Sequence, residues 1–303
     1  MPLTYSELNT LRSLPCFAEI VDISMLVDGM SHTCSKVTTA SQVYFVKRLN
    51  KETAREEIVS CRYAADHGLS PKVIYYDNTW LVTEYVDSIT VDKAELSTDK
   101  CINTSLTLMA KLHQLSPQLK AGSLPYLDTL KSVQRLFTNP VPLPAPQRVI
   151  LAKITHILTS TIEAEQKLSG AANVLCHGDI NYSNILFDKT QQSWLIDFEC
   201  SHLAPVEFDL SMFIAVNNIS THLIEDIVAS YTLLVPDYRP NQTLLTYYLL
   251  YSFFINGLWY LDNTYDLKAN NTLRSLAIEQ WSAFDSFALK SLVDLPKLKP
   301  LIN

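Results

Sequence analysis

Three polar residues late in the chain have the types and the spacing needed to transfer a phosphoryl group from ATP. Asp179 lies in a polar loop, Asn184 follows it by five residues, and Asp197 follows it by eighteen. One carboxylate can orient an attacking hydroxyl, whereas an amide and a second carboxylate can hold magnesium. A single loop aspartate more often caps backbone amides. Because the three occur together, we expect all of them to be catalytic, with Asp179 as the base and Asn184 and Asp197 as magnesium ligands.

Neighbouring residues extend the predicted site. Glu199 lies two residues beyond Asp197 and would point to the same side if the strand continued. We expect Glu199 to contact the metal or the substrate; assistance to a second magnesium ion and simple hydrogen bonding stay open. His177 either contacts the substrate or, as we prefer, holds the loop by hydrogen bonds. Gly178 occupies a turn position where a side chain would be crowded.

A lysine in the first part of the chain is a candidate phosphate contact. In an alternating apolar stretch, Lys47 lies on the same side as Phe45 and Val43, and therefore toward the interior. A buried lysine needs an anionic partner, which ATP phosphates and a helix glutamate would supply. Glu57 is the preferred glutamate and Glu56 the alternative. By itself, Lys47 also fits a surface position on an edge strand.

Two further stretches are candidates for nucleotide binding. In a predicted turn, Ser31, Thr33 and backbone amides would contact phosphate. This turn lacks the G-x-G-x-x-G pattern, and the chain has only six glycines and no Walker A motif. Residues 81–86 would connect two lobes, with Glu84 and Val86 offering backbone hydrogen bonds to adenine. An ordinary edge strand is the alternative for this segment.

The pattern of predicted elements changes about 90 residues into the chain, from alternating strands to helices with three- to four-residue periodicity. A helix over 53–67 ends at Gly68. The predicted strands cover 19–27, 35–39, 42–49, 73–76 and 80–86. The later helices cover 106–113, 148–168, 210–216, 223–234, 243–262 and 273–288, with a proline-rich connector at 138–146.

Composition limits the class of protein. The chain has 303 residues, 48% of them hydrophobic and 18% charged, which is typical of a globular protein. A net charge of −7 without basic clusters argues against nucleic-acid binding. The six cysteines form no C-x-x-C pair, so buried free thiols in a reducing cytoplasm are expected and zinc is not. The N-terminus lacks the pattern of a secretory signal.

A charge-free stretch over 244–261 reaches the length of a membrane span. It contains threonine, tyrosine, serine, asparagine and glycine, and no second such stretch accompanies it. We therefore expect a buried helix and no membrane insertion.

Taken in order, these motifs resemble the aminoglycoside phosphotransferase and choline/ethanolamine/thiamine kinase superfamily, whose fold is similar to that of protein kinases. The resemblance implies an α+β, bilobal fold, with a small antiparallel-sheet lobe and one helix over 1–86 and a larger, mainly helical lobe over 87–303. It also implies ATP and Mg2+ as cofactors, Lys47 as a phosphate contact paired with Glu57, and Asp209 as the acid that braces the catalytic loop. The matching segments are 46–47, 55–57, 68–71, 81–85, 112–113, 177–184, 196–199 and 207–210.

A small-molecule hydroxyl fits this pattern better than a protein substrate. Asp209 follows Asp197 by only twelve residues, too few for a long activation segment, and Gly178 stands where protein kinases have arginine. The segments 196–200 and 252–259 are similar to the choline, ethanolamine and thiamine kinase branch. Trp259 is the best candidate for a cation–π contact with the substrate. We thus predict a cytoplasmic phosphotransferase of a small, cationic alcohol, acting as a monomer or homodimer.

Three alternatives stay open. Aromatic stripes at helical spacing are often core, which applies to Trp259, Tyr260 and Trp281. A nucleotide-binding pseudokinase would explain the missing glycine-rich loop, but not why every catalytic acid is present. An aminoglycoside acceptor is compatible with four acidic residues, Glu199, Glu207, Asp262 and Asp266.

Overall fold

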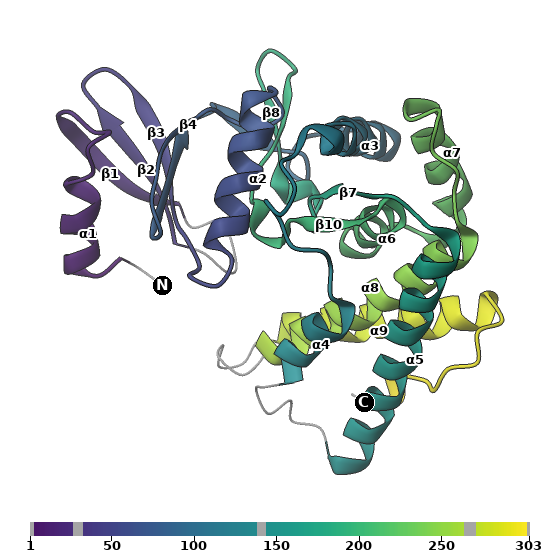
Figure 1. Ribbon diagram of the computed structural model, residues 1–303. Helices are drawn as coiled ribbons and strands as arrows, with labels where there is room; N and C mark the ends of the chain where they lie inside the picture. The colour runs from purple at the N-terminus through teal and green to yellow at the C-terminus, as the bar shows by residue number, and fades with distance from the viewer. Residues whose placement is uncertain (1–2, 27–32, 138–143, 264–270, 302–303) are drawn as a thin grey trace. The chain divides into compact units, whose positions relative to one another are not determined.

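A computed structural model of the protein describes residues 3–26, 33–137, 144–263 and 271–301 (Figure 1). Contacts divide the chain into two compact units. The first unit comprises Met1–Pro125 and Tyr182–Ser201, and the second comprises Tyr126–Asn181 and His202–Asn303. The first holds a five-stranded antiparallel sheet and the second is mainly helical. The predicted α+β class is therefore confirmed, whereas the lobe boundary after residue 86 stays a prediction.

The first unit is built on an antiparallel sheet with the strand order β1-β2-β3-β5-β4. The strands are β1 (Ile20–Leu26), β2 (Cys34–Thr39), β3 (Val43–Arg48), β4 (Val73–Tyr76) and β5 (Trp80–Glu84). All five were predicted, with ends that differ by at most two residues. Strand β5 lies between β3 and β4, so the interpretation of this segment as an edge strand is wrong.

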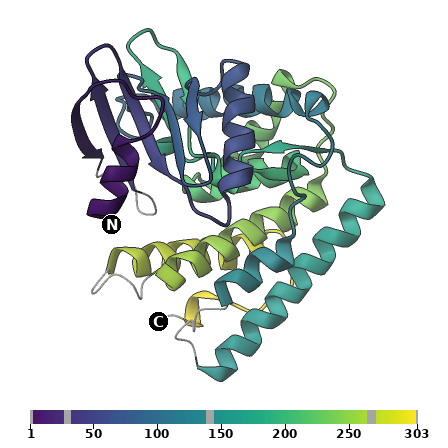
Figure 2. The same cartoon turned by 60° about the vertical axis from the view of Figure 1, so that its left-hand side comes forward.

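Different helices cover the two faces of the sheet (Figure 2), and side-chain alternation along β3 determines what each face presents. Tyr44 and Val46 join Leu11 in a buried apolar cluster, and Leu11 belongs to α1 (Tyr5–Arg12). Lys47 points to the opposite face, where it meets Glu57 of α2 (Ala54–Asp66). The sheet therefore separates an apolar cluster from a charged one.

Helix α1 was not predicted, although its start carries a sequence signal. The Thr4 hydroxyl accepts a hydrogen bond from Glu7 N at 3.3 Å, and the Glu7 carboxylate accepts one from Thr4 N at 2.8 Å. This reciprocal capping box satisfies backbone groups of the first turn. The helix has eight residues and buries only Leu11, so its apolar periodicity is too short to stand out.

A three-stranded sheet of the first unit carries part of the predicted site. Its order is β6-β8-β9, with β6 (Ser88–Thr90), β8 (Ile185–Asp188) and β9 (Ser193–Leu195). The single helical turns η2 (Tyr182–Asn184) and η3 (Phe198–Cys200) flank the β8–β9 hairpin. Helix α3 (Thr98–Gln114) buries Leu106, Met109 and Leu112 at helical spacing and leads to the short turn η1 (Ser116–Gln118).

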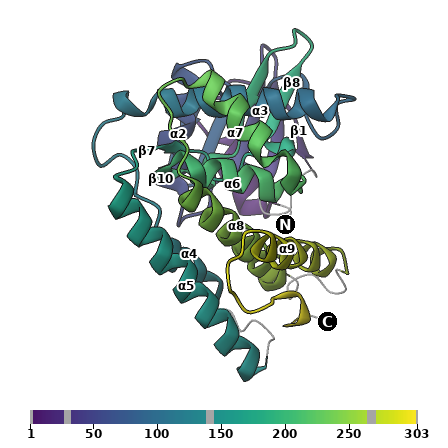
Figure 3. The same ribbon diagram turned by 90° about the vertical axis from the view of Figure 1, so that its right-hand side faces the viewer.

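The second unit combines a two-stranded ladder with packed helices (Figure 3). The ladder pairs β7 (Asn173–Cys176) with β10 (His202–Pro205). The helices are α4 (Thr129–Phe137), α5 (Ala145–Ser169), α6 (Val206–Val216), α7 (Ile224–Leu234), α8 (Gln242–Asn263) and α9 (Asn271–Lys290), with turns η4 (Thr221–Leu223) and η5 (Lys299–Leu301). Helix α4 was not predicted. Helix α5 ends at Gly170, whose φ of 62° suits glycine.

Helix α8 contains the charge-free stretch noted in the sequence. Leu249, Phe253 and Phe254 are at most 2% exposed, so the prediction of a buried helix is confirmed. Over the ranges that the structure describes, no helix is long and apolar enough to cross a membrane.

All six cysteines lie in the described ranges and are free thiols, as predicted. Cys61, Cys101 and Cys176 are buried. Cys16 and Cys34 are half-buried, and the expectation of burial is wrong for Cys200, which is exposed in η3.

The contact between α8 and α9 yields a prediction about stability. A Cβ at Gly257 of α8 would lie 2.1 Å from Nε1 and 2.3 Å from Cδ1 of Trp281. Trp281 is fully buried, and its Nε1 donates a hydrogen bond to the Phe254 carbonyl at 3.2 Å. Gly257→Ala should therefore displace the indole and lower the free energy of unfolding by about 3 kcal/mol or more, measured by urea denaturation.

Gly170→Ala is the matched control for this substitution. Its added Cβ would meet nothing within 4 Å, although φ is positive, so it should cost only about 1–2 kcal/mol of backbone strain. An equal loss at Gly170 and Gly257 would contradict the role assigned to the indole.

Candidate active site

A buried cluster of charges in the first unit brings together residues that are far apart in the sequence. Lys47 Nζ lies 2.6 Å from Glu57 Oε1 and 2.6 Å from Asp197 Oδ1. Lys47 is 3% exposed and Glu57 is 1% exposed. The predicted inward orientation of Lys47 and its pairing with Glu57, rather than with Glu56, are thus present. The contact with Asp197 was not predicted, because no local pattern reports a pairing across 150 residues.

Burial and mutual attraction act in opposite directions on these groups. Burial alone would lower the pKa of Lys47, but the carboxylates of Asp197 and Glu57 raise it above its ordinary value. Burial raises the pKa of Glu57 to about 7, because the loss of hydration outweighs the attraction of Lys47. Lys47 therefore carries a positive charge at neutral pH.

The position of Asp197 differs from the prediction. Strand β9 ends at Leu195, so Asp197 does not end a strand, and its φ of 67° places it in the left-handed region. Aspartate is among the residues that tolerate this conformation. The chain then enters η3, and Glu199 does not follow Asp197 along a strand. Strand alternation is therefore the wrong reason for placing the two carboxylates on one side.

The two carboxylates nevertheless come close together through the turn η3. One oxygen each from Glu57, Asp197 and Glu199 lies within 4.8 Å of the others. With Lys47 nearby, three carboxylates face one ammonium, so the group carries excess negative charge whenever Asp197 and Glu199 are ionised, even if Glu57 is protonated. Oxygen ligands in such a group are those that magnesium prefers. The cluster therefore fits a divalent cation.

The β8–β9 hairpin explains why Asn184 and Asp197 belong to one end of the same sheet. Ile185 pairs with Leu195 at the open end of the hairpin. Asn184 immediately precedes this pair, and its carbonyl accepts a hydrogen bond from Ile196 N at 3.0 Å. The spacing of thirteen residues between Asn184 and Asp197 is thus the length of one hairpin with its flanking turns.

The loop after β7, in the second unit, holds Asp179. Asn181 Nδ2 donates hydrogen bonds to both carboxylate oxygens of Asp179, each at 3.1 Å. The His177 ring accepts one from Asp179 N through Nδ1 at 3.3 Å, which agrees with the preferred role of His177 in holding the loop. Asn181 was not singled out from the sequence, because a single asparagine in a loop carries no specific signal.

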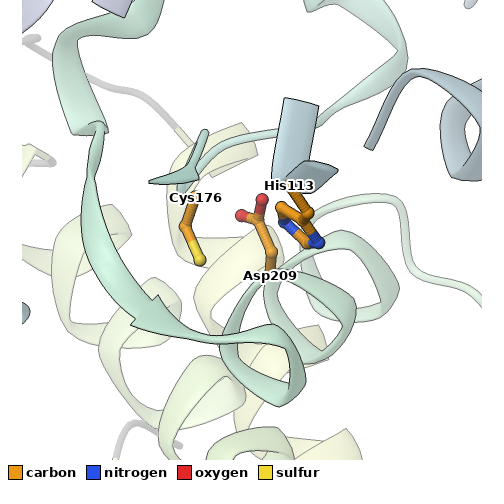
Figure 4. A group of neighbouring side chains, drawn as sticks. All are labelled: His113, Cys176 and Asp209. Atoms are coloured by element: carbon orange, nitrogen blue, oxygen red, sulfur yellow. The ribbon is translucent and has the colours of Figure 1, made fainter. Parts of the chain in front are cut away.

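Asp209 fixes the first residues of this loop. Its carboxylate accepts hydrogen bonds from His177 N at 2.9 Å and from Gly178 N at 2.8 Å. Figure 4 shows this carboxylate beside the end of β7, where Cys176 is also buried. Gly178 has a φ of 79°, which explains the need for glycine. Bracing by Asp209, expected from the family resemblance, is therefore visible as two hydrogen bonds.

The remaining candidates for nucleotide contacts differ in how far the structure describes them. Ser31 lies outside the described residues. Glu84 N donates to the Lys72 carbonyl at 2.9 Å, and the Val86 carbonyl accepts from the Ser88 hydroxyl at 3.1 Å. The Glu84 amide is thus already used in the sheet, and the adenine contacts of Glu84 and Val86 stay predictions.

The three aromatic candidates in the second unit separate into two groups. Trp281 is fully buried and hydrogen-bonded to α8, so it is a core residue. Trp259 and Tyr260 are half-buried, with ring centroids 5.4 Å apart and planes at 77°. Burial, with a smaller contribution from the charge of Asp179, raises the pKa of Tyr260. Trp259 and Tyr260 therefore stay candidates for substrate contact.

Comparison of the sequence with models of known protein families identifies the family of this chain. Residues 22–242 match the Phosphotransferase enzyme family, so the chain belongs to this family. A search of curated proteins gave no match.

Solved structures confirm the kinase-like fold. The chain is similar to choline kinase LicA from Streptococcus pneumoniae, with a TM-score of 0.73 and 15% identity over 95% of this chain and 100% of that one. It is similar to a choline/ethanolamine kinase family protein from Mesorhizobium loti, with a TM-score of 0.68 and 16% identity over 94% of each chain. Spectinomycin phosphotransferase in complex with ADP and spectinomycin gives a TM-score of 0.57 and 18% identity over 100% and 98%.

Proposed function

We propose that the protein is an ATP- and magnesium-dependent kinase that phosphorylates the hydroxyl of a small, cationic molecule of the choline, ethanolamine or thiamine type. The observation that carries this proposal is the buried Lys47 held between Glu57 and Asp197 at 2.6 Å. A lysine fixed between two carboxylates is preorganised to contact phosphates. Membership of the Phosphotransferase enzyme family supports the same reaction class.

Each predicted residue has a role in this proposal. Asp179, oriented by Asn181, would accept the proton of the substrate hydroxyl and direct the hydroxyl oxygen toward the γ-phosphate. Lys47 would contact the phosphates. Asn184, Asp197 and Glu199 would hold magnesium, which supplies positive charge for the developing negative charge on the phosphoryl oxygens. Ser31, Glu84 and Val86 stay proposed contacts to the nucleotide.

The proposal that the substrate is cationic rests on Trp259 and on the net negative charge of the chain. Trp259 and Tyr260 are half-buried aromatic rings in the second unit, which also contains Asp179. Aromatic faces attract ammonium groups by roughly 0.5–2 kcal/mol. Several solved structures of similar fold are choline or ethanolamine kinases by name. An aminoglycoside acceptor is the alternative, since spectinomycin phosphotransferase has a similar fold.

An ADP-release screen tests the proposal. The panel is choline, ethanolamine, thiamine, homoserine, simple sugars and aminoglycosides, each with ATP and Mg2+. ADP release that depends on choline, ethanolamine or thiamine is the expected result. ADP release that depends only on aminoglycosides or sugars would contradict the proposed acceptor and indicate a kinase of that other acceptor class. ATP binding without turnover on any acceptor would instead favour a nucleotide-binding pseudokinase.

Glu199 gives a prediction about magnesium. Glu199→Gln removes one negative charge from the group formed with Glu57 and Asp197. In the absence of metal, the variant should melt at a higher temperature than the unmodified protein, because repulsion among the three carboxylates is reduced. Its stabilisation by millimolar Mg2+ should be smaller, since magnesium affinity falls about tenfold with one ligand lost.

Glu56→Gln is the matched control for this experiment, because Glu56 precedes Glu57 on α2 but does not belong to the carboxylate group. Differential scanning fluorimetry with and without Mg2+ measures both effects. If Glu199→Gln and Glu56→Gln respond equally to Mg2+, Glu199 is not a metal ligand.

A further inference from the structure

The first unit contains a cavity of about 530 Å3 lined by residues that have no role in the proposed reaction. One wall is a face of α3, and the other walls are the Gly68–Leu69 segment and the turn between β8 and β9. Cavities of roughly 300–1,000 Å3 hold small organic molecules. The size therefore suits a metabolite rather than a single ion.

The charge of this cavity is opposite to that of the whole chain. Two lysines, Lys100 and Lys111, are among the lining residues, and no carboxylate is, although the chain carries a net charge of −7. Within the described ranges, no ion pair involves either lysine. Asp188 in the adjoining hairpin accepts hydrogen bonds from the backbone of Thr190 and Gln192, and it is not part of the lining. The lining of the cavity thus carries two positive charges and no negative one.

The other lining groups are mostly hydrogen-bonding side chains. The amides of Asn103, Gln191 and Gln192 offer donors to a ligand, as do the hydroxyls of Thr104 and Ser193. The Thr107 hydroxyl is used within α3, where it donates to the Asn103 carbonyl at 2.7 Å. Lysines combined with several neutral donors match the acceptor oxygens of a phosphate group.

The spacing of the lysines sets the shape of the ligand. Lys100 and Lys111 are eleven residues apart on α3, which is about three turns and roughly 16 Å along one face. A single phosphate would draw both flexible side chains inward from opposite ends of the cavity, whereas two anionic groups in one molecule can engage each lysine near its own end. We propose that this cavity binds a small phosphorylated metabolite with at least two anionic groups, at a site separate from the catalytic residues.

The site is placed to influence catalysis through short backbone connections. The Leu69 carbonyl accepts a hydrogen bond from Leu195 N at 2.7 Å. Leu69 lines the cavity and follows α2, which carries Glu57, while Leu195 lies two residues before Asp197. A ligand that shifts this connection would act on both carboxylate partners of Lys47. We therefore expect occupancy to change turnover.

Two double variants test the proposal. Lys100→Ala with Lys111→Ala removes the charge of the cavity, and Lys51→Ala with Lys120→Ala removes two exposed lysines of the same unit outside it. Titration calorimetry at constant ionic strength would use inorganic phosphate, pyrophosphate, tripolyphosphate and citrate. The nucleotide site is unchanged in both variants, so its contribution cancels. Tripolyphosphate should bind about tenfold more weakly to the cavity variant and within twofold of normal to the control.

The expected order of affinity is tripolyphosphate above pyrophosphate above phosphate, with citrate weaker than tripolyphosphate. Equal affinity in all three proteins, or an equal loss in both double variants, would overturn the site. Citrate binding as tightly as tripolyphosphate would overturn the assignment to phosphate. A change in kcat caused by tripolyphosphate that disappears only in the cavity variant supports regulation, and an unchanged kcat overturns it.

Discussion

Replacing Asp179 by asparagine should lower kcat about 10²- to 10⁴-fold, the range typical for loss of a general base. The substitution preserves size and removes the charge that accepts the proton. Asn181 holds both Asp179 oxygens by hydrogen bonds at 3.1 Å, so the loop is built around a carboxylate at this position. Nothing in the proposed nucleotide contacts involves Asp179, and ATP affinity should stay within a few fold of normal. ADP release and calorimetric ATP binding measure the two quantities separately.

Asp237→Asn is a matched control, because Asp237 is an exposed residue of the same unit. It should leave both turnover and ATP binding unchanged. If Asp179→Asn retains turnover within threefold of normal, the assignment of Asp179 as the base is wrong. If it loses ATP affinity as strongly as turnover, its main role lies in nucleotide binding.

The elements that the sequence predicted best are those defined by short-range patterns. The local sequence pattern located every strand of the five-stranded sheet, and Gly68, predicted as the end of the helix before it, follows α2 with a positive φ. The short segment from Asp179 to Asn184 was recognisable because its polar residues interrupt apolar strands at fixed spacing. In each case, the information lies within about ten residues of the element it describes.

What the sequence did not reveal depends on single backbone conformations or on distant contacts. Asp197 itself has a φ of 67° and turns the chain into η3 just after β9 has ended, and no periodic pattern reports such a change. The contact between Lys47 and Asp197 joins β3 to the start of η3, across 150 residues of sequence. A core position for Trp281 was expected from its helical spacing, but its close contact with Gly257 joins two helices, and no pattern within either helix predicts it.

Lys47 should be needed for both stability and activity, and the two requirements can be separated. Lys47→Met removes the ammonium between Glu57 and Asp197 and leaves Glu57, which is 1% exposed, without its counter-ion. Breaking a buried pair in this way costs about 3–5 kcal/mol of unfolding free energy. In Lys47→Met with Glu57→Met, no buried charge of the pair remains, so most of this loss should be recovered. Turnover should stay abolished in both variants, because the proposed phosphate contact is missing.

The pH dependence of the Lys47→Met variant provides a further check. Burial raises the pKa of Glu57 from 4.5 to about 7 in the presence of Lys47, and removal of the ammonium raises it further. A folded-state pKa above the unfolded value means that stability is fully present below the unfolded pKa and is lost as the pH rises through the folded one. The variant should therefore be more destabilised at pH 8 than at pH 5, whereas the double variant should lack this difference.

Arg48→Met is the control for these measurements, because Arg48 is the next residue of β3 and faces the opposite way. Arg48 forms an ion pair with Glu7 at 2.8 Å, and its side chain is 45% exposed. Exposed ion pairs contribute only about 0–1 kcal/mol to the free energy of unfolding. Urea denaturation at the two pH values compares all four proteins. A loss in Lys47→Met no larger than that in Arg48→Met, or one that Glu57→Met does not relieve, would contradict the argument. Recovery of stability without recovery of turnover would instead show that the buried pair is retained for the reaction rather than for the fold.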